Sequence, residues 1–215
     1  MNYKKMLVEA GKQMLQSGLT VETWGNISLR DPDTDLIYLT PSGMPYDDIE
    51  EEDVVVMDLN GNRVEGERKP TVETPMHLLI YQNRSDVNAI IHTHPVHSLV
   101  FGVLHQSIPA IIDEAAQTLG DEVRCTNYAL PGSKEIAEEA LNALGENYAC
   151  ILANHGALLV GRDLDYAFKA AKVLEMTAEI YHYALSTGGK ITRISEEDGE
   201  YMRDFMNNHY GQDKE

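Results

Sequence analysis

The stretch Ala89-Ile90-Ile91-His92-Thr93-His94-Pro95 places an apolar, β-branched run directly before two histidines and a proline. Such a run predicts a buried strand over 89–94, which the proline should end. Side chains two positions apart on a strand project to the same side, so His92 and His94 can reach one point. Convergent imidazoles suit a metal ion, although in a chain with 8 histidines the number of such pairs expected by chance is already roughly 0.3.

A third histidine, His155, follows a second apolar run over 149–153 and precedes Gly156. We expect this run to be a strand too, with the glycine allowing close approach of backbone or ligand. Three histidines at strand ends are typical of a catalytic divalent metal, most often zinc, with a fourth position for a carboxylate, water or substrate. Glu73, just before an expected helix, is the candidate for that position; its alternative role is a favourable interaction with the helix N-terminus.

Two turn segments and a threonine have the composition of an anion site. Gly25-Asn26-Ile27-Ser28 and Thr40-Pro41-Ser42-Gly43 combine hydroxyls, an amide and glycines, which lets successive N–H groups converge on a phosphate. Taken singly, each segment is typical of an ordinary turn. Together with Thr71 they favour a site for a small phosphorylated ligand more than any one of them does.

Helical and strand patterns alternate along the rest of the chain. Thr74 is expected to cap a helix over 74–83, with Pro75 at its first position, and 113–131 has no clear pattern. This alternation predicts an α/β fold with helices on both faces of one sheet, in a single domain over 1–215. Further helices are expected over 6–15, 97–104, 134–144, 163–187 and from 195, and further strands over 23–30, 36–40 and 53–59, with a short apolar run over 108–112.

Charge and composition exclude several classes of function. The 215 residues include 17 Lys+Arg and 35 Asp+Glu, a formal net charge of −18 without a basic cluster, so nucleic acid and anionic membrane surfaces are not expected partners. No stretch approaches the roughly 18 uninterrupted apolar residues of a membrane span. Cys125 and Cys150 alone predict no disulfide framework, and the N-terminus is typical of a helix and not of a signal peptide, so we expect a cytoplasmic protein.

Five motifs in order resemble the class II aldolase and adducin family, and most of all its L-fuculose-phosphate aldolases. The motifs are Thr23-Trp24-Gly25-Asn26-Ile27-Ser28, Thr40-Pro41-Ser42-Gly43, Lys69-Pro70-Thr71-Val72-Glu73, His92-Thr93-His94-Pro95 and Asn154-His155-Gly156. The resemblance implies a three-layer α/β/α domain with a mostly antiparallel central sheet. It also implies a homotetramer with active sites at subunit interfaces.

The resemblance further assigns residues to a metal site and to a phosphate site. Zinc, or another divalent ion such as Mn²⁺ or Co²⁺, would be bound by His92, His94, His155 and, until the substrate binds, Glu73. The substrate phosphate would be held by Gly25, Asn26, Ser42, Gly43 and Thr71.

The implied activity is reversible cleavage of a ketose 1-phosphate to dihydroxyacetone phosphate and an aldehyde, with Glu73 as acid and base. A second group must move the hydroxyl proton of the aldehyde. Asp113 stands where L-fuculose-phosphate aldolases carry a tyrosine, and Tyr210 matches a tyrosine near their C-terminus, so both are candidates. Because Val72 also replaces a serine of their phosphate pocket, related deoxypentulose and methylthioribulose 1-phosphates are candidate substrates beside L-fuculose 1-phosphate.

Three alternatives are open. An L-ribulose-5-phosphate 4-epimerase shares the fold, the metal and the retro-aldol chemistry, but generally carries Asp at the positions of Glu73 and Gln117. A methylthioribulose-1-phosphate dehydratase is the second alternative. An adducin-like binding module would keep the fold without the metal chemistry, and the complete set of three histidines and Glu73 argues against it.

Overall fold

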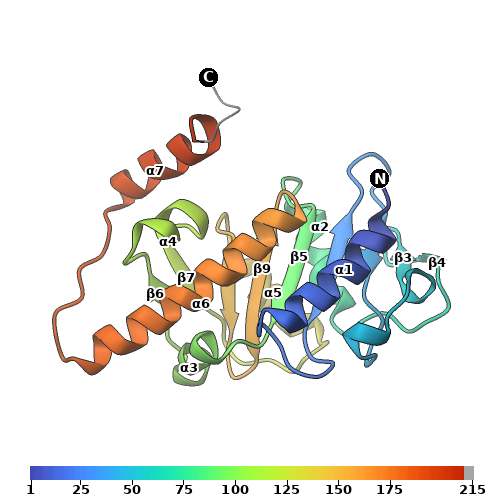
Figure 1. The fold of residues 1–215 in the computed structure, drawn as a ribbon, viewed down its shortest axis with the longest axis horizontal. Helices are drawn as coiled ribbons and strands as arrows, with labels where there is room; N and C mark the ends of the chain where they lie inside the picture. The colour runs from blue at the N-terminus through green and yellow to red at the C-terminus, as the bar shows by residue number, and fades with distance from the viewer. Residues whose placement is uncertain (211–215) are drawn as a thin grey trace.

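A single mixed sheet runs through the middle of the protein (Figure 1). The computed structural model describes residues 1–210, apart from the side chain of Asn207, and within them the sheet has nine strands in the order β4-β3-β2-β1-β5-β9-β8-β7-β6. Every neighbouring pair is antiparallel except β7 and β8, so the mostly antiparallel sheet is confirmed. The strands are β1 Asn26–Arg30, β2 Ile37–Leu39, β3 Val55–Met57, β4 Arg63–Glu65, β5 Ala89–Thr93, β6 Ile108–Pro109, β7 Glu122–Cys125, β8 Ala149–Leu152 and β9 Gly156–Gly161.

Helices cover both faces of the sheet, so the expected three layers are confirmed. Side chains alternate along the central strands: Ile91 of β5 joins the apolar core of one face, whereas Ile90 joins the core of the other. In Figure 1, α1 and the long α6 lie in front of the sheet, and α2 and α5 lie behind it. The front core includes α1 Tyr3–Gln16, α3 Val96–Leu104, α4 Asp113–Thr118 and α6 Leu164–Ser186; the rear core includes α2 Thr74–Asn83 and α5 Lys134–Leu144.

After α6 the chain runs outward from the three layers. An extended segment leads to α7 Glu196–Asn208, which contacts α4 and projects beyond the three layers (Figure 1). Two single helical turns, η1 Tyr46–Asp48 and η2 Glu51–Asp53, precede β3. Among residues 1–210, no helix combines the length and apolar character needed to cross a membrane.

Three strands and one helix were not predicted from the sequence, and the structure shows why. All three residues of β4 are exposed and all of β9 is buried, so neither strand shows an alternating pattern. β7 and the six-residue α4 are short elements of the segment that had no clear pattern. The capping prediction was wrong: Glu73 is the N-cap of α2 and Thr74 is already helical, because the Thr74 hydroxyl donates to the carbonyl oxygen of Thr71 at 2.7 Å.

Candidate metal centre

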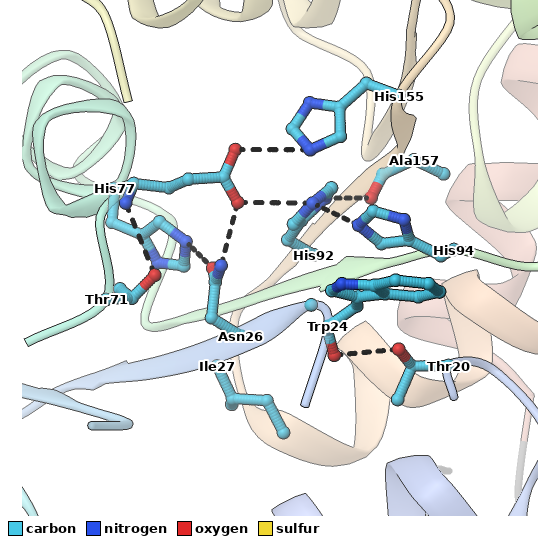
Figure 2. A network of polar contacts seen from close by, with 12 residues as sticks. Thr20, Trp24, Asn26, Ile27, Thr71, His77, His92, His94, His155 and Ala157 are labelled. Atoms are coloured by element: carbon cyan, nitrogen blue, oxygen red, sulfur yellow. Dashed lines mark hydrogen bonds and ion pairs between the residues drawn. The ribbon is translucent and has the colours of Figure 1, made fainter. Parts of the chain in front are cut away.

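The end of β5 meets the starts of both neighbouring strands. Because β1 and β9 run antiparallel to β5, Asn26 at the start of β1 lies opposite His92, and Ala157 lies opposite Thr93. His155 occupies the turn between β8 and β9, and Glu73 caps the nearby helix α2. The topology thus gathers residues far apart in the chain at one edge of the sheet (Figure 2).

The three predicted imidazoles converge at this edge. One ring nitrogen from each of His92, His94 and His155 lies within 4.8 Å of the other two. The Nε2 atoms of His92 and His94 are 2.9 Å apart, and the ring centroids of the three pairs are separated by 4.6, 4.7 and 5.2 Å. Three nitrogen donors aimed at one small volume could hold a metal ion.

Hydrogen bonding sets the tautomer of His92, and burial keeps all three rings in the neutral form. The Nδ1 atom of His92 lies 3.0 Å from the carbonyl oxygen of Ala157, so it must donate, and the lone pair of His92 is left on Nε2. Burial lowers the pKa of His92 to about 4 and that of His155 to about 4. Burial, together with the neighbouring histidines, lowers the pKa of His94 to about 3. All three rings are therefore neutral at pH 7, the form that binds a metal.

Glu73 adds a carboxylate to the three rings. Its side chain is almost fully buried, with Oε2 3.2 Å from His92 Nε2 and Oε1 3.7 Å from His155 Nε2. Oε1 accepts no hydrogen bond from the described residues. A buried carboxylate oxygen without a partner is costly, and a divalent cation between Glu73 and the imidazoles would remove that cost. The residues present therefore fit a metal ion.

At two positions beside the histidines, only a residue without a side chain fits. A Cβ atom on Gly25, whose φ is +74°, would lie 2.5 Å from the carbonyl oxygen of His92. A Cβ atom on Gly156 would lie 2.9 Å from Cε1 of the His92 ring and 2.4 Å from the carbonyl oxygen of Thr93. All three distances are well inside van der Waals contact, so only glycine allows this backbone approach.

A cleft of about 390 Å³ opens beside the histidines and is lined by every residue predicted to hold phosphate. Its two walls are joined by backbone hydrogen bonds, from Ser42 N to the Lys69 carbonyl and from Thr71 N to the Thr40 carbonyl. The hydroxyl oxygen of Thr71 accepts from Glu73 N at 3.3 Å, so its hydrogen can still be donated to a ligand. The predicted residues in the lining are Gly25, Asn26, Ser42, Gly43, Thr71, Glu73, His92, His94 and His155.

Sequence reasoning missed other residues of the cleft. Trp24 lines it with 58% of its surface exposed, and its indole stacks near the His94 ring at a centroid distance of 6.2 Å (Figure 2). Pro131 also lines the cleft and comes from the segment without a clear pattern. His77 lies behind the cleft, where it is fully buried and its Nε2 atom contacts Asn26.

Two predicted catalytic residues lie away from the cleft of their own chain. Asp113 is exposed at the first position of α4. Tyr210 follows α7, is 61% exposed, and lines a separate hollow with Gln117 and Lys169. One copy of the chain therefore does not bring either residue to the histidines.

Comparisons with known proteins agree with the geometry. The family model described as Class II Aldolase and Adducin N-terminal domain matches residues 5–182. The chain belongs to the class II aldolase and adducin family. The resemblance carried by the five motifs is thereby confirmed. Class II aldolases use a divalent metal, in agreement with the three convergent histidines.

Individual members of the class II aldolase family match over most of their length. A 5-deoxy-D-ribulose 1-phosphate aldolase of Bacillus thuringiensis serovar kurstaki is 38% identical over 185 residues, 86% of this chain and 86% of the relative. An L-fuculose phosphate aldolase of Escherichia coli K12 is 34% identical over 194 residues, 90% of this chain and 89% of the relative. A solved L-fuculose 1-phosphate aldolase structure superposes with a TM-score of 0.91 at 39% identity, covering 95% of this chain and 96% of its own.

Proposed function

We propose that this class II aldolase family member is a metal-dependent aldehyde-lyase. It would reversibly cleave a ketose 1-phosphate to dihydroxyacetone phosphate and an aldehyde. The supporting observation is that three neutral imidazoles and Glu73 share one cleft with the hydroxyl and glycine turns suited to a phosphate. Candidate substrates are L-fuculose 1-phosphate, 5-deoxyribulose 1-phosphate and methylthioribulose 1-phosphate, which differ in the aldehyde half.

The metal ion would be held by His92, His94 and His155, with Glu73 as a further ligand until the substrate binds. Imidazole nitrogens with one open position suit zinc, and Mn²⁺ or Co²⁺ are the alternatives. Bound there, the cation supplies a Lewis acid that stabilises the negative charge developing on the ketone oxygen as the carbon–carbon bond breaks.

Glu73 would carry the proton at carbon. In the cleavage direction it protonates the carbon of the dihydroxyacetone phosphate fragment that has lost its bond to the aldehyde, and in the condensation direction it removes that proton. Its carboxylate is buried, and Oε1 accepts no hydrogen bond from the part of the chain that the structure describes, which suits this exchange.

The substrate phosphate would lie between the two glycine turns. Ser42 and Thr71 offer hydroxyl hydrogens, Gly25 and Gly43 allow the backbone to approach, and Asn26 has a second amide hydrogen beyond the one that it gives to Glu73. Val72 is exposed at the rim and offers no hydroxyl.

The proton on the aldehyde hydroxyl needs a second group, and we assign it to Tyr210 or Asp113 of a neighbouring copy in a homotetramer with shared sites. Mixing inactive Glu73→Gln and Tyr210→Phe subunits tests this assignment. Recovered activity in the mixture supports a shared site that uses Tyr210, and a mixture as inactive as its parents argues against it.

Solvent exchange on dihydroxyacetone phosphate tests the proposed half-reaction for every candidate substrate at once. In D₂O, the zinc-loaded protein should replace one carbon-bound hydrogen by deuterium, followed by NMR. A chelator should stop the exchange and added zinc should restore it. Glu73→Gln should slow it by about 100-fold or more. A zinc-loaded wild type that exchanges no hydrogen would refute the aldolase proposal.

A further inference from the structure

A buried chain of hydrogen bonds leads from helix α2 to Glu73. The Tyr81 hydroxyl lies 2.9 Å from Ser28 Oγ, which lies 2.6 Å from His77 Nδ1. His77 Nε2 lies 2.6 Å from Asn26 Oδ1, and Asn26 Nδ2 donates to Glu73 Oε2 at 2.8 Å (Figure 2). None of the five side chains is more than 5% exposed, so water does not compete for these bonds.

The donor and acceptor chemistry of these groups decides which atom donates in each hydrogen bond of the series. A carboxylate only accepts, so Asn26 turns its NH₂ group to Glu73 and its oxygen to His77. That oxygen accepts, so His77 Nε2 carries the hydrogen. Burial lowers the pKa of His77 to about 3, so the ring is neutral and Nδ1 accepts from the Ser28 hydroxyl. Because the Ser28 hydrogen is given to His77, the Tyr81 hydroxyl is the donor toward Ser28, whose Oγ and carbonyl oxygen lie 2.9 and 3.0 Å from it. From Ser28 onward, each donor points toward Glu73.

His77 thereby decides which end of the Asn26 amide faces the carboxylate. If the amide rotated by 180°, its NH₂ group would face the N–H of His77 and its oxygen would face Glu73, and both contacts would be repulsive. The bond from Asn26 engages Oε2 alone, while Oε1 is buried, accepts no hydrogen bond within residues 1–210, and lies 3.7 Å from His155 Nε2. The two oxygens of Glu73 are therefore not equivalent.

We infer that His77 is a positioning residue that acts through Asn26 to hold Oε2 of Glu73, leaving Oε1 as the oxygen that meets the metal ion and the proton of the substrate. The kinetic part of this inference rests on the proposed function. A substitution at His77 tests positioning without removing a substrate contact, because His77 is fully buried and does not line the cleft.

Three variants separate positioning from packing. His77→Gln can keep both a donor and an acceptor, whereas His77→Met fills a similar volume without either. Ile80→Val is the matched control, because Ile80 is equally buried on α2 and trimming it costs packing without touching the chain of hydrogen bonds.

The tautomer of His77 can be measured on the zinc-free wild type, with no variant and no activity required. Long-range ¹H–¹⁵N spectra at neutral pH should show the ring neutral, with its hydrogen on Nε2 and none on Nδ1. A neutral ring with its hydrogen on Nδ1 and none on Nε2 would overturn the inference, because Nε2 would then accept and the amide of Asn26 would no longer be held with its NH₂ group toward Glu73.

Exchange kinetics on dihydroxyacetone phosphate and zinc affinity test the consequence. In the zinc-loaded protein, His77→Met should lower kcat by about 10- to 100-fold with KM within about threefold, and His77→Gln should recover kcat to within about threefold of wild type. Ile80→Val should match wild type. A His77→Met variant with wild-type kcat, a loss confined to KM, or a His77→Gln variant as slow as His77→Met would each overturn the inference.

Failure of the proposed function gives a different result. If the zinc-loaded wild type exchanges no hydrogen, the aldolase proposal is refuted, and chelator competition then decides the positioning role. A zinc affinity of His77→Met about tenfold or more below that of Ile80→Val would support a held Glu73 carboxylate. Equal zinc affinities in the two variants would overturn it.

Discussion

Acidification should destabilise the protein, and His77 should account for a measurable share of the loss. The ring is fully buried, and burial lowers its pKa to about 3, against an ordinary value of 6.5 in the unfolded chain. Between pH 7.5 and 5.5 the unfolded chain therefore takes up a proton at this position and the folded protein does not. Stability contributed by the neutral ring is complete above pH 6.5 and is lost as the pH falls toward the folded pKa.

The expected magnitude follows from linkage. A single group with these two pKa values lowers the free energy of unfolding by about 1.4 kcal/mol between pH 7.5 and 5.5. Any folded pKa below about 4.5 gives nearly the same figure, because the folded ring stays neutral throughout this range.

Urea unfolding in the presence of a chelator at pH 7.5, 6.5 and 5.5 measures the effect without a contribution from bound metal. His77→Gln removes the titrating group and leaves the other acidic and basic groups in place. The wild type should lose about 1.4 kcal/mol more than His77→Gln over this range. Parallel pH profiles of the two proteins would refute the reasoning, because they would mean that the ring is solvated or charged in the folded state.

Three further substitutions separate the metal site from the scaffold. His94→Ala should lose zinc and proton exchange while the circular dichroism spectrum is retained; a zinc-loaded, active variant would remove His94 from the ligand set. Gly156→Ala should lower zinc affinity and cost about 1–3 kcal/mol of stability, because its Cβ would crowd the His92 ring; unchanged zinc affinity and unfolding would count against this. Glu175→Ala should cost about 2 kcal/mol, since the Glu175 carboxylate accepts three hydrogen bonds at the start of α3, yet zinc titration should match wild type.

Much of the candidate site could be predicted because its three histidines are encoded in short local patterns. The run before His92 identifies a buried strand, two-residue spacing places His94 on the same side, and the glycine after His155 marks close approach. Antiparallel pairing of β5 with β1 and β9 then brings these short signals together. The three layers followed equally from elements long enough to show a pattern.

The features that were missed depend on contacts distant in sequence. His77 joins the site through Asn26, 51 positions earlier, and only the packing of α2 on β1 brings the two together. Trp24 was missed because the exposure of its indole depends on how segments distant in the sequence pack around it. Asp113 and Tyr210, although predicted, lie outside the cleft of their own chain, so their proposed roles would require a neighbouring copy of the chain.

Release of dihydroxyacetone phosphate from a panel of ketose 1-phosphates tests the central claim most directly. The purified protein would be incubated with L-fuculose, 5-deoxyribulose and methylthioribulose 1-phosphates, with ribulose 5-phosphate in parallel, before and after treatment with a chelator. We expect release from at least one 1-phosphate, lost with the chelator and restored by zinc. No release from any of the three by the zinc-loaded protein, above all alongside epimerisation of ribulose 5-phosphate, would contradict the account.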